Sequence, residues 1–194
     1  MCYYSTIIMN TELYRDLNPG NNYPWVQVTE IEKGIYLGGI PEPRDDPEGC
    51  QELNSTHAPH SIIEKYGIET ILSFTDKEVW WNIDPKVYTL HFVLEDSPDT
   101  NIKQCFSKIV SRLDVARKEG NPIFVHCAAG ISRSATALCA YYIYAGIPGI
   151  SQPSVSDVVK FLQSKRPFVI PNPGFLKQLV EYHEEVNKDE CVIM

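Results

Sequence analysis

The sequence predicts an α/β fold in which a central, mostly parallel sheet is flanked by helices. Short apolar segments with the composition of buried strands alternate along the chain with segments of helical periodicity, an order typical of such sheets. The chain has 194 residues, of which 43% are hydrophobic, enough to bury one sizeable core. One main domain is the natural expectation at this length.

The N-terminal part is expected to hold two strands between two less regular segments. Residues 1–24 are polar and rich in tyrosine, which indicates an extension to the fold. Residues 25–39 alternate between apolar and polar side chains around a turn at Lys33-Gly34, as two adjacent strands do. Residues 41–61 are crowded with Pro, Asp, Asn and Ser, and such a long run of turn-forming residues predicts a loop insertion.

The rest of the chain alternates between predicted strands and predicted helices. Three apolar runs predict strands, at 68–74, 86–94 and 122–126. Five segments of helical pattern predict helices, at 61–67, 102–120, 132–145, 154–165 and 173–187. Gly120 is expected to end the second of these helices at a C-terminal capping position. The sequence therefore predicts one main domain over 25–187, followed by a tail at 188–194.

The composition restricts the partners and the compartment. The net charge is −8 and the isoelectric point is near 5.1, whereas nucleic-acid binding usually requires a basic surface, so we expect no nucleic-acid partner. The six cysteines show no paired CxxC spacing. Neither a signal peptide nor an apolar run long enough for a membrane span is evident. These features predict a reduced, cytoplasmic protein with free thiols.

The most informative segment is 122–145, where an apolar strand leads to Cys127 and a helix follows a small loop. The Ala-Ala-Gly sequence at 128–130 has almost no side chains, so that its backbone N–H groups can turn toward one anion at the helix N-terminus. Arg133 adds a planar fork that can hold two phosphate oxygens. The same field favours the thiolate form of a cysteine. The segment therefore predicts phosphoryl transfer through a phosphocysteine.

Residues 126–134, His-Cys-Ala-Ala-Gly-Ile-Ser-Arg-Ser, resemble the signature loop H-C-x5-R-S of the cysteine-dependent protein phosphatases. The run Ala-Gly-Ile-Ser-Arg-Ser is similar to the dual-specificity subgroup in particular. The resemblance extends over about 25–186 and includes GIYLGG, GIETILSF, EDSPDT and KRPFVIPNPGFLKQL in the family's order. It implies the fold of these phosphatases and hydrolysis of phosphotyrosine and phosphoserine or phosphothreonine in phosphoproteins, without cofactor or metal.

The resemblance also implies a role for each residue of this loop. Cys127 is the expected nucleophile, and Arg133 is expected to bind the phosphate and stabilise the transition state. Ser134 is expected to donate to the sulfur and help it leave during hydrolysis. His126 is expected to be buried, to shape the loop and to keep the thiol acidic. The expected phosphate-binding residues are Ala128, Ala129, Gly130, Ile131, Ser132 and Arg133.

A proton donor for the leaving group is expected in the segment after the 86–94 strand. Glu95, Asp96 and Asp99 are the candidates from residue chemistry. In the resembling family the acid is the Asp of a D-S-x-x-x-x-I pattern, which is Asp96 here, while Asp99 fits better as a helix cap or a solvated turn. The tyrosine-specific phosphatases have larger domains and a Trp-Pro-Asp loop, which this sequence lacks, so a shallower pocket is implied.

Two further features have alternative interpretations. Asn172 matches a position that the family uses near the catalytic loop, and a turn-forming Asn between two prolines explains it equally well. Cys50, His57 and His60 lie in the predicted 41–61 loop, but no pair has a recognised ligand spacing. We therefore expect a solvated loop there and no metal.

The sequence ends in Cys191-Val-Ile-Met, which fits the C-a-a-X box of a farnesylation site. The alternative is a chance match on a frayed end. One lipid alone binds membranes weakly, and the preceding residues are acidic, so we expect weak or reversible membrane association. The prenylated regenerating-liver phosphatases are similar in this tail only, because their loop lacks the Ser that follows the Arg here.

Three other functions stay open from the sequence alone. An enzyme acting on lipids, glycans or RNA ends is disfavoured, because the loop carries no lysines and no carbohydrate-binding module is evident. An inactive phosphate-binding module would need a defect that the sequence does not reveal. A redox thiol is disfavoured by the lack of a CxxC partner, although an exposed thiolate is oxidisable and oxidation would silence the enzyme.

Overall fold

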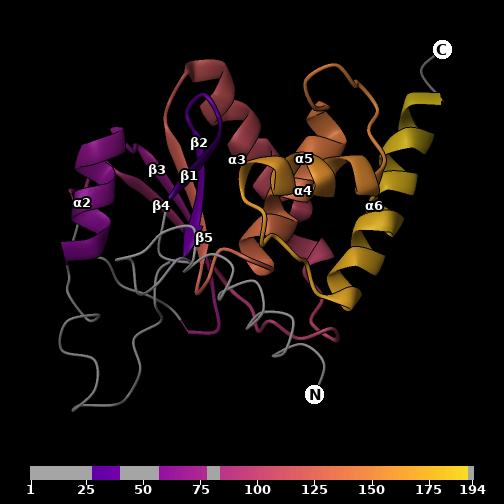
Figure 1. Cartoon of the computed structure of the whole chain (residues 1–194), viewed down its shortest axis with the longest axis horizontal. Helices are drawn as coiled ribbons and strands as arrows, with labels where there is room; N and C mark the ends of the chain where they lie inside the picture. Colours follow the sequence, from indigo (N-terminus) through magenta and orange to yellow (C-terminus); the bar gives the residue numbers. More distant parts are fainter. Residues whose placement is uncertain (1–27, 40–56, 78–83, 192–194) are drawn as a thin grey trace.

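The computed structural model describes residues 28–39, 57–77 and 84–191 (Figure 1). The predicted extension at 1–24 and residues 41–56 of the predicted loop lie outside this part of the chain. The described strands form one five-stranded sheet in the order β1-β2-β5-β3-β4. The strands are β1 (Thr29–Glu32), β2 (Ile35–Gly39), β3 (Thr70–Thr75), β4 (Tyr88–Val93) and β5 (Ile123–Cys127).

The sheet is mostly parallel, as the sequence predicts. β1 and β2 pair antiparallel around the turn at Lys33-Gly34. The pairs β2–β5, β5–β3 and β3–β4 are all parallel. β5 therefore lies in the middle of the sheet with a parallel neighbour on each side, which explains why all its residues are buried and why most of them are apolar.

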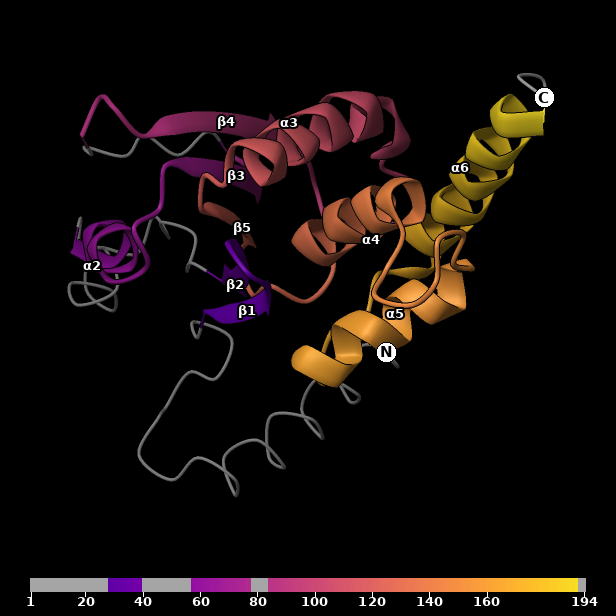
Figure 2. The ribbon, with the colours of Figure 1, turned by 90° about the horizontal axis from the view of Figure 1, so that it is seen from above.

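Helices cover both faces of the sheet (Figure 2). One face is covered by α2, and the other by α3 to α6. The helices are α2 (His57–Tyr66), α3 (Phe106–Glu119), α4 (Arg133–Ala145), α5 (Val155–Lys165) and α6 (Pro173–Cys191), with a 3-10 turn, η2 (Lys103–Cys105), before α3. Gly120 ends α3 with φ of 75°, in the left-handed conformation that suits glycine. All five predicted helices are thus present.

Alternate residues of β5 face the two layers of core. Phe124 packs with the α2 side of the sheet, and its ring stacks on that of His126. Ile123, Val125 and Cys127 belong to the larger core that the other helices enclose. Because neighbouring residues of a strand point to opposite faces, the sheet sends His126 and Cys127 to opposite sides of the same strand end.

Two predicted boundaries are wrong. Residues 57–61 were predicted as part of the loop, yet α2 begins at His57. Pro59 lies in the first turn of that helix, where the backbone N–H groups have no helical partner, so its missing donor costs little. The last helix continues past the predicted end at 187 to Cys191. Within the described ranges, no helix combines the length and the apolar character needed to cross a bilayer.

Candidate active site

Cys127 lies at the carboxyl end of the central strand, and the residues after it form a short loop into α4. Arg133 is the first residue of α4, so that loop occupies 128–132. Ligands of open α/β sheets bind at the carboxyl ends of the strands, and the N-terminus of a helix favours an anion. The fold therefore places the predicted strand, loop and helix where a phosphate site is expected.

The Cys127 sulfur is buried and accepts two hydrogen bonds. The Gly130 N–H donates to Sγ at 3.1 Å, and the Ser134 hydroxyl donates to it at 3.2 Å. One donor belongs to the loop and the other to the first turn of α4, so that the sulfur is held at the N-terminus of this helix.

Two other cysteines have a different environment. Cys139 is completely buried in α4, and burial raises the pKa of its thiol. Cys105 is half-buried against the core, and burial raises its thiol pKa as well. Both thiols therefore pack in the core, with Cys105 only partly covered.

The conformation of the loop 128–132 depends on Gly130 and on contacts from Arg166. Gly130 has φ of 66°, and a Cβ there would lie 2.5 Å from the carbonyl carbon of Gly38 and 2.8 Å from Nη2 of Arg166. Arg166 is itself buried, and its Nε and Nη2 donate to the carbonyls of Gly130 and Ala129 at 3.0 and 3.1 Å. These bonds fix carbonyls on one side of the loop, which leaves Gly130 N–H directed at the sulfur. Sequence reasoning missed Arg166.

Arg133 connects the loop to the segment that follows β4. Its side chain is 7% exposed, and its Nη1 donates to the carbonyl of Leu94 at 3.0 Å. Its Nε lies 3.9 Å from Oδ2 of Asp96. The guanidinium is therefore oriented by backbone and carboxylate at the mouth of the anion site.

His126 is buried and neutral at physiological pH. Burial is the main cause that lowers the pKa of this imidazole to about 3. Its Nδ1 lies 3.4 Å from the carbonyl of Cys127, and its Nε2 lies 2.7 Å from the Ser73 hydroxyl. Since a carbonyl only accepts, the neutral ring donates through Nδ1 and accepts from Ser73. Ser73, which the sequence analysis missed, thus orients the histidine that precedes Cys127.

Asp96 is the acidic candidate that contacts the catalytic loop. Its Oδ1 accepts a hydrogen bond from the Ser132 hydroxyl at 2.7 Å and another from Nδ2 of Asn172 at 2.8 Å. The side chain is 36% exposed, so that it is held but still reaches solvent. Ser132 occupies the N-cap of α4 without capping it through its side chain. Its hydroxyl donates to Asp96 instead, a contact that the sequence did not reveal.

Both interpretations of Asn172 hold. Its Oδ1 accepts from the N–H of Phe175 at 2.9 Å, which is a cap at the start of α6. Its own N–H donates to the Ser132 hydroxyl at 3.1 Å, in addition to the bond that its side chain makes to Asp96. One asparagine therefore caps a helix and supports the acid.

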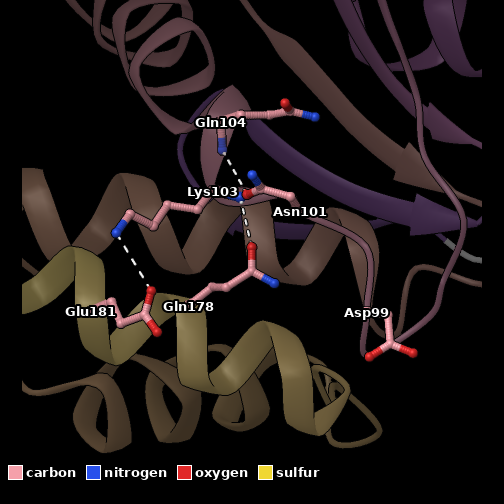
Figure 3. A pocket seen from close by; sticks show the side chains of 6 residues that line it. All are labelled: Asp99, Asn101, Lys103, Gln104, Gln178 and Glu181. Atoms are coloured by element: carbon pink, nitrogen blue, oxygen red, sulfur yellow. Dashed lines mark hydrogen bonds and ion pairs between the residues drawn. The ribbon is translucent and has the colours of Figure 1, made fainter.

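The other two acidic candidates are at the surface. Glu95 and Asp99 are both exposed. Asp99 borders a separate cavity of about 460 Å³ between the start of η2 and α6 (Figure 3). Asp96, which is exposed as well, is the candidate that hydrogen-bonds to Ser132 in the loop after Cys127. In the described ranges, no group of three His, Cys, Asp or Glu side chains is arranged to hold a metal ion.

Comparison with known proteins gives a consistent result. The family model "Dual specificity phosphatase, catalytic domain" matches residues 52–185, more than half of the chain. Dual specificity protein phosphatase 1 of Arabidopsis thaliana is 27% identical over 180 residues, which cover 93% of this chain and 77% of that protein. MAP kinase phosphatase with leucine-rich repeats protein 3 of Dictyostelium discoideum is 31% identical over 158 residues, 81% of this chain but 16% of that longer protein.

Solved structures show the same architecture. The human tyrosine phosphatase-like serine/threonine/tyrosine-interacting protein matches with a TM-score of 0.67 and 25% identity, over 82% of this chain and 97% of that one. Human DUSP28 matches in fold, with a TM-score of 0.64 and 20% identity over 82% of this chain and 95% of that one.

The fold and these matches together show that the chain is a cysteine-dependent phosphatase. More particularly, the chain belongs to the dual specificity phosphatase family. It is a protein phosphatase for phosphotyrosine and phosphoserine or phosphothreonine, and the predictions of fold and of enzyme class are confirmed.

Proposed function

We propose that this phosphatase acts in two steps through a phosphocysteine on Cys127, with Asp96 as the acid and then the base. The observation that carries the proposal is the convergence of the Cys127 sulfur, the loop N–H groups, Arg133 and Asp96 at one strand end. No step needs a metal or a cofactor, because the loop supplies the charge that a phosphate requires.

In the first step the phosphate monoester lies in the loop 128–133, where backbone N–H groups and Arg133 bind its oxygens. The Cys127 thiolate attacks phosphorus, an S–P bond forms, and the bond from phosphorus to the ester oxygen breaks. The carboxyl of Asp96 gives its proton to that oxygen, which leaves as a tyrosine, serine or threonine hydroxyl. Asp96 is then a carboxylate.

In the second step water replaces the cysteine. The Asp96 carboxylate takes a proton from water as the oxygen attacks phosphorus, and the S–P bond breaks. The electron pair returns to sulfur, where the Ser134 hydroxyl, already 3.2 Å away, stabilises the departing thiolate. Inorganic phosphate leaves, and Asp96 is protonated again. His126 acts indirectly, by holding the carbonyl of Cys127.

The proposal is tested by hydrolysis of p-nitrophenyl phosphate in the presence of EDTA, with Cys127→Ser beside Cys105→Ser as the matched control. We expect wild type and Cys105→Ser to retain activity with the chelator and Cys127→Ser to lose it while still binding phosphate. Activity that persists in Cys127→Ser would contradict the nucleophile. A folded, reduced wild type without activity would instead indicate a phosphate-binding module.

We also propose a domain boundary, a compartment and a modification. The catalytic domain is placed at 25–187, after an extension at 1–24 and before a tail at 188–194, and the protein is expected in the cytoplasm. Where Met194 is the terminal residue, the last four residues are a farnesylation site with Cys191 as acceptor. Because the flanking residues are acidic, membrane binding through that single lipid is weak.

The modification is tested by incubating the full chain with farnesyl diphosphate and a farnesyltransferase, with Cys191→Ser and Cys105→Ser as paired variants. A farnesyl mass increase in wild type and Cys105→Ser, absent from Cys191→Ser, is expected. The modified protein should sediment only partly with anionic vesicles. An unmodified wild type would rule out the lipid, and fractionation of cells expressing the full chain tests the compartment.

A further inference from the structure

Helix α6 lies directly against the acid loop, which we define as residues 94–102, between β4 and η2. Gly174, in the first turn of α6, has no side chain, and a Cβ there would overlap the carbonyl of Pro98. The backbones of the helix and the loop are therefore in contact two residues beyond Asp96. Any larger residue at this position must move one of them.

Gln178 bonds the same helix to the backbone of Thr100 in the acid loop and to that of Lys103, the first residue of η2. Figure 3 shows the bond to Lys103. The Oε1 of Gln178 accepts from the N–H of Lys103 at 2.9 Å, and its Nε2 donates to the carbonyl of Thr100 at 2.9 Å. A side-chain amide offers one acceptor and donors in a fixed plane, so both ends of this group are used. Gln178 follows Gly174 by one helical turn, which places both on one face of α6.

A third contact is weaker. Nζ of Lys103 lies 2.6 Å from Glu185 and 3.5 Å from Glu181, both on α6. The three side chains are 28%, 55% and 45% exposed, and exposed ion pairs contribute little. The contact between α6 and the acid loop thus depends mainly on Gly174 and Gln178.

We propose that Gly174 and Gln178 are positioning residues for the general acid, a role that rests on the proposed function of Asp96. The start of α6 reaches the carboxyl directly, since Asn172 caps the helix and donates to Oδ1 of Asp96. Gly174 and Gln178 fix the loop backbone to the same helix. The helix therefore sets both where the loop lies and where the carboxyl points.

A displaced acid has a specific signature. General acid catalysis matters most when the leaving group is a poor one, because a good leaving group departs without a proton. We expect Gln178→Ala to lower kcat/KM for phenyl phosphate about tenfold, and for p-nitrophenyl phosphate by less than about twofold. Gly174→Ala should have the same signature, because its Cβ pushes Pro98 away. Lys177→Ala, an exposed change on the same helix, should match wild type on both substrates.

Two further measurements separate positioning from a general loss of structure. The rate of Cys127 alkylation by iodoacetate should be unchanged in Gln178→Ala, because the two hydrogen bonds of Gln178 go to Lys103 and Thr100 rather than to the loop after Cys127. In an Asp96→Asn background, Gln178→Ala should cause no further loss on phenyl phosphate, since there is no acid left to position. Gln178→Glu, which keeps the acceptor and loses the donor, replaces the alanine variant if that fails to fold.

The failures of this inference and of the proposed function are distinguishable. Equal losses on the two substrates in Gln178→Ala, or no loss, together with a selective loss in Asp96→Asn, would overturn the positioning role alone. No selectivity in Asp96→Asn would overturn the assignment of the acid, and the inference with it.

Discussion

The loop at residues 127–133, which holds the proposed nucleophile and is called the nucleophile loop below, and the acid loop, which holds the proposed acid, are held in different ways. The donors to the Cys127 sulfur lie three and seven residues along the chain, at Gly130 and Ser134. The donors to Asp96 lie 36 and 76 residues away, at Ser132 and Asn172. The first set is made mainly by local backbone geometry, whereas the second exists only after the sheet, α4 and α6 have packed.

This difference decides what each loop can tolerate. A contiguous loop on a helix N-terminus carries its function in a few adjacent residues, so that one substitution in it affects the phosphate, the sulfur and the backbone together. Asp96 is supported by several side chains from distant segments, so a substitution of any one of them removes only part of that support. We therefore expect large, unselective losses from changes to the backbone of the nucleophile loop, and smaller losses that depend on the leaving group from changes that remove a contact to Asp96.

The largest effect is expected from Gly130→Ala. The new Cβ would meet Gly38 and Arg166 in a backbone conformation that disfavours alanine, which turns the loop N–H groups away from the phosphate. We expect kcat/KM to fall about 100-fold or more for every aryl phosphate. Gly149→Ala is the matched control, because Gly149 also has a positive φ but open space around it. Equal activity of the two variants would contradict the role of the Gly130 turn.

A smaller and more selective effect is expected from Ser132→Ala. This change removes one hydrogen bond to Asp96 and leaves the donors to sulfur in place. We expect about a tenfold lower kcat/KM for phenyl phosphate and little change for p-nitrophenyl phosphate, measured beside Ser156→Ala, an exposed serine in α5. A loss of the same size on both substrates would mean that the Ser132 hydroxyl serves phosphate binding rather than the acid.

A third prediction concerns stability rather than rate. The folded pKa of His126, about 3, lies below the ordinary value of 6.5, so the unfolded chain binds a proton that the folded chain excludes. The contribution of neutral His126 is complete above pH 6.5 and is lost as pH falls toward 3, at up to about 1.4 kcal/mol per pH unit. Urea unfolding between pH 7 and 5 should show this slope in wild type and a shallower one in His126→Gln. Equal slopes would mean that His126 is protonated in the fold.

The same contrast explains which parts of the molecule could be predicted. The β5–loop–α4 unit was predictable because apolar β-branched residues, small loop residues and an arginine follow one another in 24 residues, 122–145. The mostly parallel sheet followed from the alternation of strands and helices. Asp96 was selected only by resemblance, since residue chemistry alone left Glu95 and Asp99 equally open.

The remaining features depend on tertiary contacts. Arg166 precedes a proline at the end of α5, and nothing in that local sequence indicates that it bonds two carbonyls more than 30 residues away. The second role of Ser132 and the contacts of Gln178 depend equally on distant partners. The error at 57–61 has a different origin, because polar turn-forming residues and a proline are also tolerated in the first turn of a helix.

The most direct test of the division between the two loops is the dependence of kcat/KM on leaving-group acidity, measured with a series of aryl phosphates for wild type, Asp96→Asn and Gly130→Ala. We predict a shallow dependence in wild type, a much steeper one in Asp96→Asn, and in Gly130→Ala the wild-type dependence at a lower rate throughout. An Asp96→Asn series parallel to wild type would contradict the assignment of the proton to the acid loop.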